Sequence, residues 1–185
     1  MSKTKFQKEQ KRKKKRIEIK KRKLTNLANL RQMFLKFDKL EEKRSEPVDL
    51  TSNFDYKSVI ENLEKAISIT KNGIGLSAPQ IGCYKRIIII RPDLKTNTIQ
   101  HFINPRMIEI TQDMTTMKEG CLSYPGYSAT ADRYVEIKLE YDTENGKEEQ
   151  TFKGIESRII QHEIDHLNGK CVVADEYKKS KEYNF

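Results

Sequence analysis

The chain has 185 residues, 36 of them basic and 27 acidic, and its formal net charge of +9 is unevenly placed. Residues 1–44 hold 18 Lys/Arg against 5 Asp/Glu, whereas residues 45–185 hold 18 against 22. No apolar run approaches the roughly 20 residues of a membrane span, and three cysteines form no disulfide framework. We therefore expect no membrane association and a cytoplasmic protein, bacterial or, if phage- or virus-encoded, in the host cytoplasm. The charge division predicts a basic extension, 1–44, before a domain, 45–185.

The extension itself has two parts. Residues 1–23 contain 13 Lys/Arg and 2 acids, including the block KRKKKR, and such density is typical of solvated, disordered segments. Between residues 24 and 40, apolar residues then recur at spacings of three and four: Leu27, Leu30, Phe34 and Phe37. This spacing predicts one face of an amphipathic helix.

Helical spacing returns over residues 56–71, and we expect Gly73 to end this helix in the left-handed conformation. The run RIIIIRP, at 86–92, predicts a buried strand. Residues 101–110 predict two short strand pieces around Asn104-Pro105.

Alternation over residues 134–142 predicts an antiparallel strand, which returns over 148–152 after a hairpin turn at Asn145-Gly146. Residues 155–167 predict a helix ended by Asn168-Gly169. The order of helix, short strands, hairpin and helix indicates an α+β fold.

The stretch QHEIDHLNG, at 161–169, carries two of the chain's three histidines. Positions four apart share one helix face, so His162 and His166 can direct two imidazoles at one metal ion. Glu163 stands beside the first histidine and can act as a base without being a ligand. The alternative is a solvent-facing helix in which this spacing arises by chance.

A catalytic site of this kind usually has three protein ligands. The 19 residues after His166 contain no histidine, and we expect no room among them for a second helix, so the third ligand is sought upstream. Cys121, in the tight segment KEGCLSYPG, is the best candidate, because a Cys/His/His set suits Fe(II), Zn or Co. The alternative is a buried, inert cysteine, which is the interpretation that we favour for the remaining two: Cys83 and Cys171.

A glycine-rich segment, NGIGLSAPQIG at 72–82, lies between the first helix and the buried strand. Alone, it is compatible with a plain turn. Gln80 offers the neutral amide donor that an oxyanion-stabilising position needs.

Three segments together resemble the signature motifs of the peptide deformylase family: GIGLSAPQ at 73–80, EGCLS at 119–123 and QHEIDH at 161–166. They follow the family's order with family-like spacing, and the resemblance covers roughly residues 45–176. It implies antiparallel and mixed sheets packed around a central, C-terminal metal-binding helix. It also implies a hydrolase that removes the formyl group from the N-terminal formyl-methionine of nascent polypeptides and releases formate.

The resemblance assigns roles to individual residues. It implies one divalent ion, Fe(II) by expectation with Zn, Ni or Co as alternatives, on three ligands: Cys121, His162 and His166. Glu163 would be the general base and then the proton donor to the leaving amine. Gln80 and the backbone N–H of Leu122 would hold the developing oxyanion.

Further residues would bind substrate or orient the ligands. The backbone of Gly75 would pair with the substrate peptide, and three isoleucines would line the methionine pocket: Ile74, Ile155 and Ile159. A charged group around the ligands would comprise Glu119, Arg133 and Asp165. The alternative for these three is an ordinary surface ion pair.

The chain also departs from the family. Ser77 stands where the family usually has Ala, and Tyr127-Ser128 lacks an Arg that many relatives carry. Many relatives have a long C-terminal helix, which docks well-known members on the ribosome, and we expect this helix to be missing here.

We therefore expect residues 3–23 to attract ribosomal RNA phosphates in its place, the alternative being a solubilising tail. We expect a monomer. An internal-bond metalloprotease and an inactive RNA-binding relative are the two other function classes that the sequence leaves open.

Overall fold

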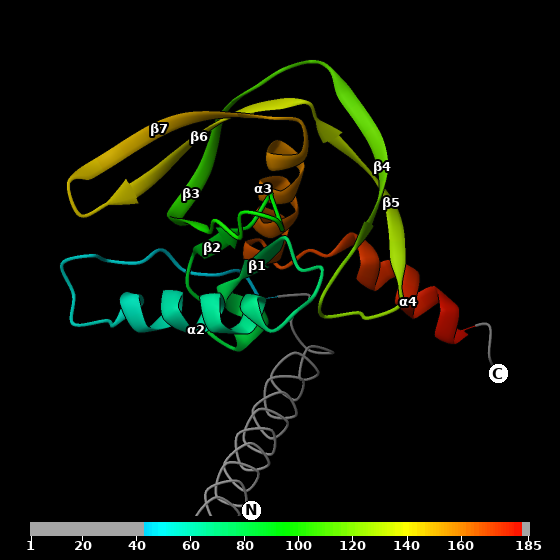
Figure 1. Ribbon diagram of the computed structural model, residues 1–185, viewed down its shortest axis with the longest axis horizontal. Coiled ribbons are helices and arrows are strands. Elements are labelled where there is room, and N and C mark those ends of the chain that lie inside the picture. The colour runs from blue at the N-terminus through cyan, green and yellow to red at the C-terminus, as the bar shows by residue number, and fades with distance from the viewer. Residues whose placement is uncertain (1–42, 183–185) are drawn as a thin grey trace, which may run out of the picture.

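The computed structural model describes residues 43–182, and Figure 1 shows their arrangement. They form a five-stranded antiparallel sheet in the order β1-β2-β3-β6-β7 and a separate two-stranded sheet of β4 and β5. The elements are α2 (Tyr56–Ser68), β1 (Gly75–Ser77), η2 (Ala78–Ile81), β2 (Ile87–Ile90), β3 (Gln100–Ile110), β4 (Met114–Gly120), β5 (Ser128–Tyr134), β6 (Glu136–Thr143), β7 (Gly146–Lys153), α3 (Gly154–Leu167) and α4 (Val172–Glu182). The expected α+β fold with a central helix is confirmed, since α3 contacts strands of both sheets.

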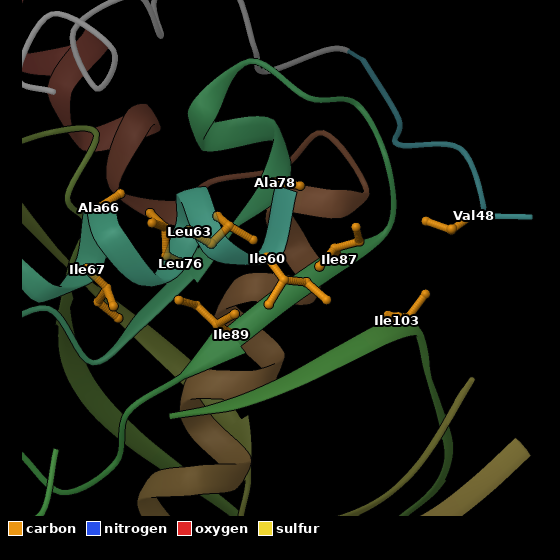
Figure 2. Packing of buried hydrophobic residues seen from close by; sticks show 10 residues of the cluster. All are labelled: Val48, Ile60, Leu63, Ala66, Ile67, Leu76, Ala78, Ile87, Ile89 and Ile103. Carbon is orange, nitrogen blue, oxygen red and sulfur yellow. The ribbon is translucent and has the colours of Figure 1, made fainter. Parts of the chain in front are cut away.

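The strand β2 is buried on both faces, as its unbroken apolar run predicts. Because successive side chains of a strand alternate, Ile87 and Ile89 face α2, whereas Ile88 and Ile90 pack with α3. Figure 2 shows the first of these cores, in which Leu63 and Ile67 of α2 lie over the sheet. The sheet is therefore a layer between two helices, and it fixes α3 against β1 and β2.

The strand β3 is continuous where two short pieces were expected. Asn104 takes a left-handed φ of 52°, and the register with β6 shifts between Ile103 and Arg106. The irregularity is thus a bulge, which bends the strand without ending it. The Asn104 side chain also ties this bulge to the preceding segment of the chain. It accepts a hydrogen bond from Val48 N (2.7 Å) and donates one to Val48 O (2.8 Å).

Two of the three expected glycine turns are confirmed. Gly146 has φ 118° in the β6–β7 hairpin, and Gly169 has φ 74° after α3. The expectation for Gly73 was wrong: α2 ends at Ser68, and Gly73 does not adopt a left-handed conformation. Gly73 is instead required for space, since an added Cβ would lie 2.3 Å from Thr70 Oγ1.

The sequence did not predict β1, β4, β5 or α4. The expectation that no second helix fits after the HExxH stretch was wrong, because α4 follows it directly. Val173 and Ala174 are fully buried, and α4 packs on β5, so two small apolar residues suffice to dock a mostly polar helix. The expected helix over 24–40 and the basic segment lie outside the described residues. Within residues 43–182, no helix is long and apolar enough to cross a membrane.

Candidate metal centre and cleft

Two elements bring a thiol and two imidazoles together. His162 and His166 lie one turn apart on α3, with ring centroids 4.9 Å apart, and Cys121 directly follows β4. A turn closed by the hydrogen bond from Tyr124 N to Cys121 O holds the cysteine in place. One ligand atom from each of these three residues lies within 4.8 Å of the others, and Cys121 Sγ is 3.3 Å from His166 Nε2.

This donor set fits a divalent metal ion. A tetrahedral ion with bonds of about 2.0–2.3 Å has ligand atoms about 3.3–3.8 Å apart, which this arrangement approaches. Glu119 Oε2 lies 2.9 Å from His162 Nδ1, which leaves Nε2 of that ring as the ligand atom. Burial lowers the pKa of His166 well below its usual value, which favours the neutral imidazole that metals bind.

A buried charge network supports His162, and Glu119 is its centre. Arg133 donates to both Glu119 oxygens (3.0 and 2.9 Å), and Arg158 donates to Oε1 (2.6 Å). Arg133 also pairs with Asp165. Burial raises the pKa of Glu119, but hydrogen bonds from His162 and Arg133 outweigh it and lower the pKa to about 2. Glu119 is therefore a carboxylate at any ordinary pH, and it holds the imidazole in one orientation.

Glu163 lies on α3 and is 3% exposed. Burial raises its pKa to about 7, against the opposing effects of His162 and Ser77. Its Oε2 is buried and has no hydrogen-bond partner among residues 43–182, so its capacity to accept a hydrogen bond is unused. Gly75 makes the close approach of β1 possible, because an added Cβ would lie 2.4 Å from Glu163 Oε1.

The amide of Gln80 has a defined orientation. Its Oε1 accepts hydrogen bonds from Ser77 N (2.9 Å) and Ser77 Oγ (2.8 Å). Its Nε2 donates to Ser123 Oγ (3.1 Å) and lies 3.6 Å from Cys121 Sγ. The donor side of the amide therefore faces the metal ligands, as an oxyanion-stabilising group requires.

A cleft of about 780 Å³ runs past these groups. Ile74, Gly75, Ile155 and Ile159 line it together with Leu122. Ile155 is 48% exposed and lies at the rim, whereas Ile159 is 4% exposed. In the described part of the chain, β1 is an edge strand of its sheet, so one side of its backbone is available to pair with a peptide.

The structure thus gathers the residues that the sequence singled out, and it adds others. Glu119 and Arg133 are each 8% exposed, which rules out a surface ion pair for these two. Sequence reasoning missed Arg158, Ser123 and Cys171. Arg158 precedes the HExxH stretch by one helical turn, a spacing that places it on the same face as His162 and could have identified it. Nothing in the sequence marked Cys171 as a neighbour of Cys121.

Comparison with known proteins agrees with this geometry. The family model described as polypeptide deformylase matches residues 34–182. A peptide deformylase of Prochlorococcus marinus (strain NATL2A) is 42% identical over 136 residues, which are 68% of this chain and 66% of that protein. The chain thus spans slightly under two thirds of the length of that relative.

Solved structures give the same result. The chain resembles a peptide deformylase from Plasmodium falciparum with a TM-score of 0.69 and 34% identity, covering 80% of this chain and 90% of that one. It resembles the Met-Ala-Ser-bound class I type b peptide deformylase from Acinetobacter baumannii with a TM-score of 0.62 and 32% identity, covering 73% and 90%. The chain belongs to the polypeptide deformylase family.

Proposed function

We propose that this protein hydrolyses the N-formyl group of formyl-methionyl peptides and releases formate. The observation that carries this proposal is that the Cys121/His162/His166 set lies beside a cleft lined by two of its members, Cys121 and His162, by the buried Glu163 and by the oriented amide of Gln80. Membership of a metal-dependent family supports it. The A. baumannii relative was solved bound to Met-Ala-Ser, a short methionyl peptide, which supports a substrate of this class.

The ion that we propose is Fe(II), with Zn, Ni or Co able to occupy the same ligands. One thiolate and two imidazoles form a donor set of intermediate softness, which these ions share. A bound divalent ion would supply a Lewis acid that activates water and polarises the formyl carbonyl.

Glu163 is the general base and general acid in this proposal. Its partnerless oxygen would accept a proton from the attacking water and then deliver it to the departing nitrogen, which must be protonated for the amide bond to break. A carboxyl group with a pKa of about 7 exchanges protons readily near neutral pH.

The developing negative charge on the formyl oxygen needs donors that are already in place. Gln80 Nε2 and the backbone N–H of Leu122 are the two that we propose, and each such donor is typically worth about 2.7–4 kcal/mol in the transition state. The two hydrogen bonds from Ser77 hold the Gln80 amide, so little reorganisation is needed during the reaction.

Substrate binding is assigned to the edge of β1 and the apolar part of the cleft. We propose that the Gly75 backbone pairs with the peptide, as in strand addition to a sheet edge. Unbranched methionine would fit the slot between Ile74, Ile155 and Ile159, because its flexible thioether adapts to irregular apolar surfaces. Glu119 would orient His162, with Arg133 and Arg158 holding Glu119 and Asp165 holding Arg133, so that all four would be positioning residues.

We further propose that the protein is a monomer. We also propose that a basic extension, 1–44, precedes the catalytic domain, 45–185. We propose that residues 3–23 bind ribosomal RNA, on the basis of their Lys/Arg density. Ribosome pelleting with full-length protein and with a 1–23 deletion tests this: binding should fall on deletion and with rising salt. Equal pelleting of both proteins would contradict it.

The deciding experiment is formate release from formyl-Met-Ala-Ser by anaerobically prepared, Fe(II)-loaded protein. Glu163→Ala should abolish release while the protein still binds metal. Glu61→Ala, which removes an exposed glutamate on α2, is the matched control and should retain full activity. No release by the wild-type protein with metal bound would overturn the proposed function.

A further inference from the structure

Two thiols lie against each other beside the metal centre. Cys171 stands between α3 and α4, and its side chain packs in the same buried region as that of Cys121. Both residues are 9% exposed, and both are free cysteines. They belong to one buried cluster, which also contains Tyr124, Ala129, Val173 and Ala174.

The two thiols differ in their access to solvent molecules that enter the cleft. Cys121 lines the cleft, whereas Cys171 is not among its lining residues and is set back from it. A small oxidant would therefore meet the Cys121 sulfur first, and Cys171 would be the neighbouring thiol. That is the arrangement of an oxidisable cysteine beside a resolving cysteine.

We propose that Cys121 and Cys171 form a reversible disulfide when the metal-free protein meets a hydroperoxide, and that this bond protects Cys121 from irreversible oxidation. The two side chains already belong to one buried cluster, and a disulfide requires the sulfurs to close to about 2.05 Å. The segment before α4 and the turn after β4 are the two pieces of backbone that would adjust.

The chemistry is balanced with hydrogen peroxide as the oxidant. The Cys121 sulfur attacks one peroxide oxygen, the O–O bond breaks, and the thiol proton leaves with the second oxygen as water. Cys171 then attacks the sulfur of the resulting sulfenic acid, and its proton leaves with the hydroxyl group as a second water. Two thiols lose two electrons and two protons, and the peroxide is reduced to two waters.

The consequence for the site follows from the donor count. A disulfide removes the thiolate and leaves only His162 and His166 of the three ligands, so the oxidised protein should bind metal weakly. This consequence rests on the proposed metal site. Disulfide formation itself is measured on metal-free protein and does not depend on deformylase activity, so the two proposals can fail separately.

The three cysteines can be distinguished by one digest, because trypsin places them in separate peptides. Cys83 falls in residues 72–85, Cys121 in 119–133 and Cys171 in 171–178. Metal-free protein is treated with a small excess of hydrogen peroxide, alkylated in denaturant, digested and analysed by mass spectrometry before and after dithiothreitol.

We expect the free thiols to fall from three to one, with a loss of about 2 Da. Peptides 119–133 and 171–178 should be linked, and dithiothreitol should restore both thiols and the metal binding. Prior loading with Zn should slow the reaction, since it engages the Cys121 sulfur.

Variants complete the test. In Cys171→Ala, the same treatment should leave Cys121 as sulfinic or sulfonic acid, which dithiothreitol does not reverse. Cys83→Ala removes a half-buried cysteine of the other core and should behave as the wild type. Cys171→Ser, with a thermal unfolding curve for each variant, controls for packing. Irreversible oxidation of Cys121 in the wild type, or a link through Cys83, would overturn the proposal.

Discussion

Two groups of ion pairs use the same residue types in different surroundings. One is the buried network of Glu119 with Arg133, Arg158, His162 and Asp165, which we call the Glu119 network. The other lies on strands β3, β6 and β7 and is called here the strand network: Arg106, Glu109, Lys138, Glu140, Asp142, Lys147 and Glu149.

The difference between them lies in the solvent around each charge. Arg133 and Glu119 side chains are 9% and 7% exposed, whereas Lys147 and Arg106 are 64% and 66% exposed. Water and salt screen the exposed pairs, so they contribute little to stability. A buried charge that loses its partner has no such compensation. Removing one partner should therefore cost far more folding stability in the Glu119 network than in the strand network.

The largest effect is expected for Glu119→Gln. It leaves two buried guanidinium groups without their carboxylate, which typically costs about 3–5 kcal/mol of stability. It also replaces one acceptor oxygen with an NH2 donor, so the side chain can no longer accept from His162 and from both arginines at once. The affinity for metal should therefore fall about 10–100-fold. Urea unfolding and metal titration measure the two effects.

Glu140→Gln in the strand network is the matched control. Its own side chain is 15% exposed, but both cations that it pairs with are largely exposed, so stability should fall by about 1 kcal/mol or less and the affinity for metal should not change. Equal losses in the two variants would show that burial does not separate the networks.

A smaller loss is expected for Arg133→Lys. Lysine keeps the charge but cannot reproduce the planar fork that contacts both Glu119 oxygens and Asp165. Unpaired buried acceptors typically cost about 1–3 kcal/mol. Stability should fall by that amount, and the KM for formyl-Met-Ala-Ser should change less than kcat, because Arg133 does not line the cleft. A rise in KM alone would contradict the positioning role.

Acid should remove the contribution of Glu119 gradually. Its pKa is about 2 in the folded protein against 4.5 unperturbed, so its ionised form is favoured by folding. The stabilisation, about 3 kcal/mol, is fully present above pH ~4.5 and is lost as the pH falls toward 2. The difference in unfolding free energy between metal-free wild type and Glu119→Gln should shrink over this window. A constant difference down to pH 2.5 would show that the pKa is not depressed.

The smallest effect is expected for Lys147→Gln, which cuts two exposed contacts of the strand network at once. The unfolding midpoint should stay within experimental error of the wild type. Any difference between wild type and variant at low salt should vanish at 1 M salt, where the Debye length is about 3 Å. A difference in unfolding midpoint that persists at 1 M salt would show that the Lys147 contacts behave like those of the buried Glu119 network.

The two networks also show what sequence reasoning could reach. His162, Glu163 and His166 were accessible because helical periodicity relates residues four apart. The β2 run and the Asn145-Gly146 turn were accessible because each carries a strong local signal. Arg158 was not found, although its spacing from His162 was available in the sequence. Cys171 was not found, because its place near Cys121 depends on α4 packing against β5.

The strands β4 and β5 themselves lacked a signal. In β4, MTTMKEG, every residue except Glu119 is exposed, and the sequence shows neither apolar alternation nor a buried run. The pairing of β4 with β5 stabilises them through backbone hydrogen bonds, which no side-chain pattern records. The glycine of the first motif was misread for a related reason, since Gly73 is needed for space and not for a turn.

The available edge of β1, where Gly75 lies, has a consequence for the range of clients that such a protein could serve. A strand edge recognises backbone amides, which all polypeptides share, and is indifferent to most side chains that point away from it. Only the first residue would meet the apolar slot. We therefore expect turnover to vary little across peptides that differ beyond their second residue, as a general-purpose processing step for many unrelated proteins requires.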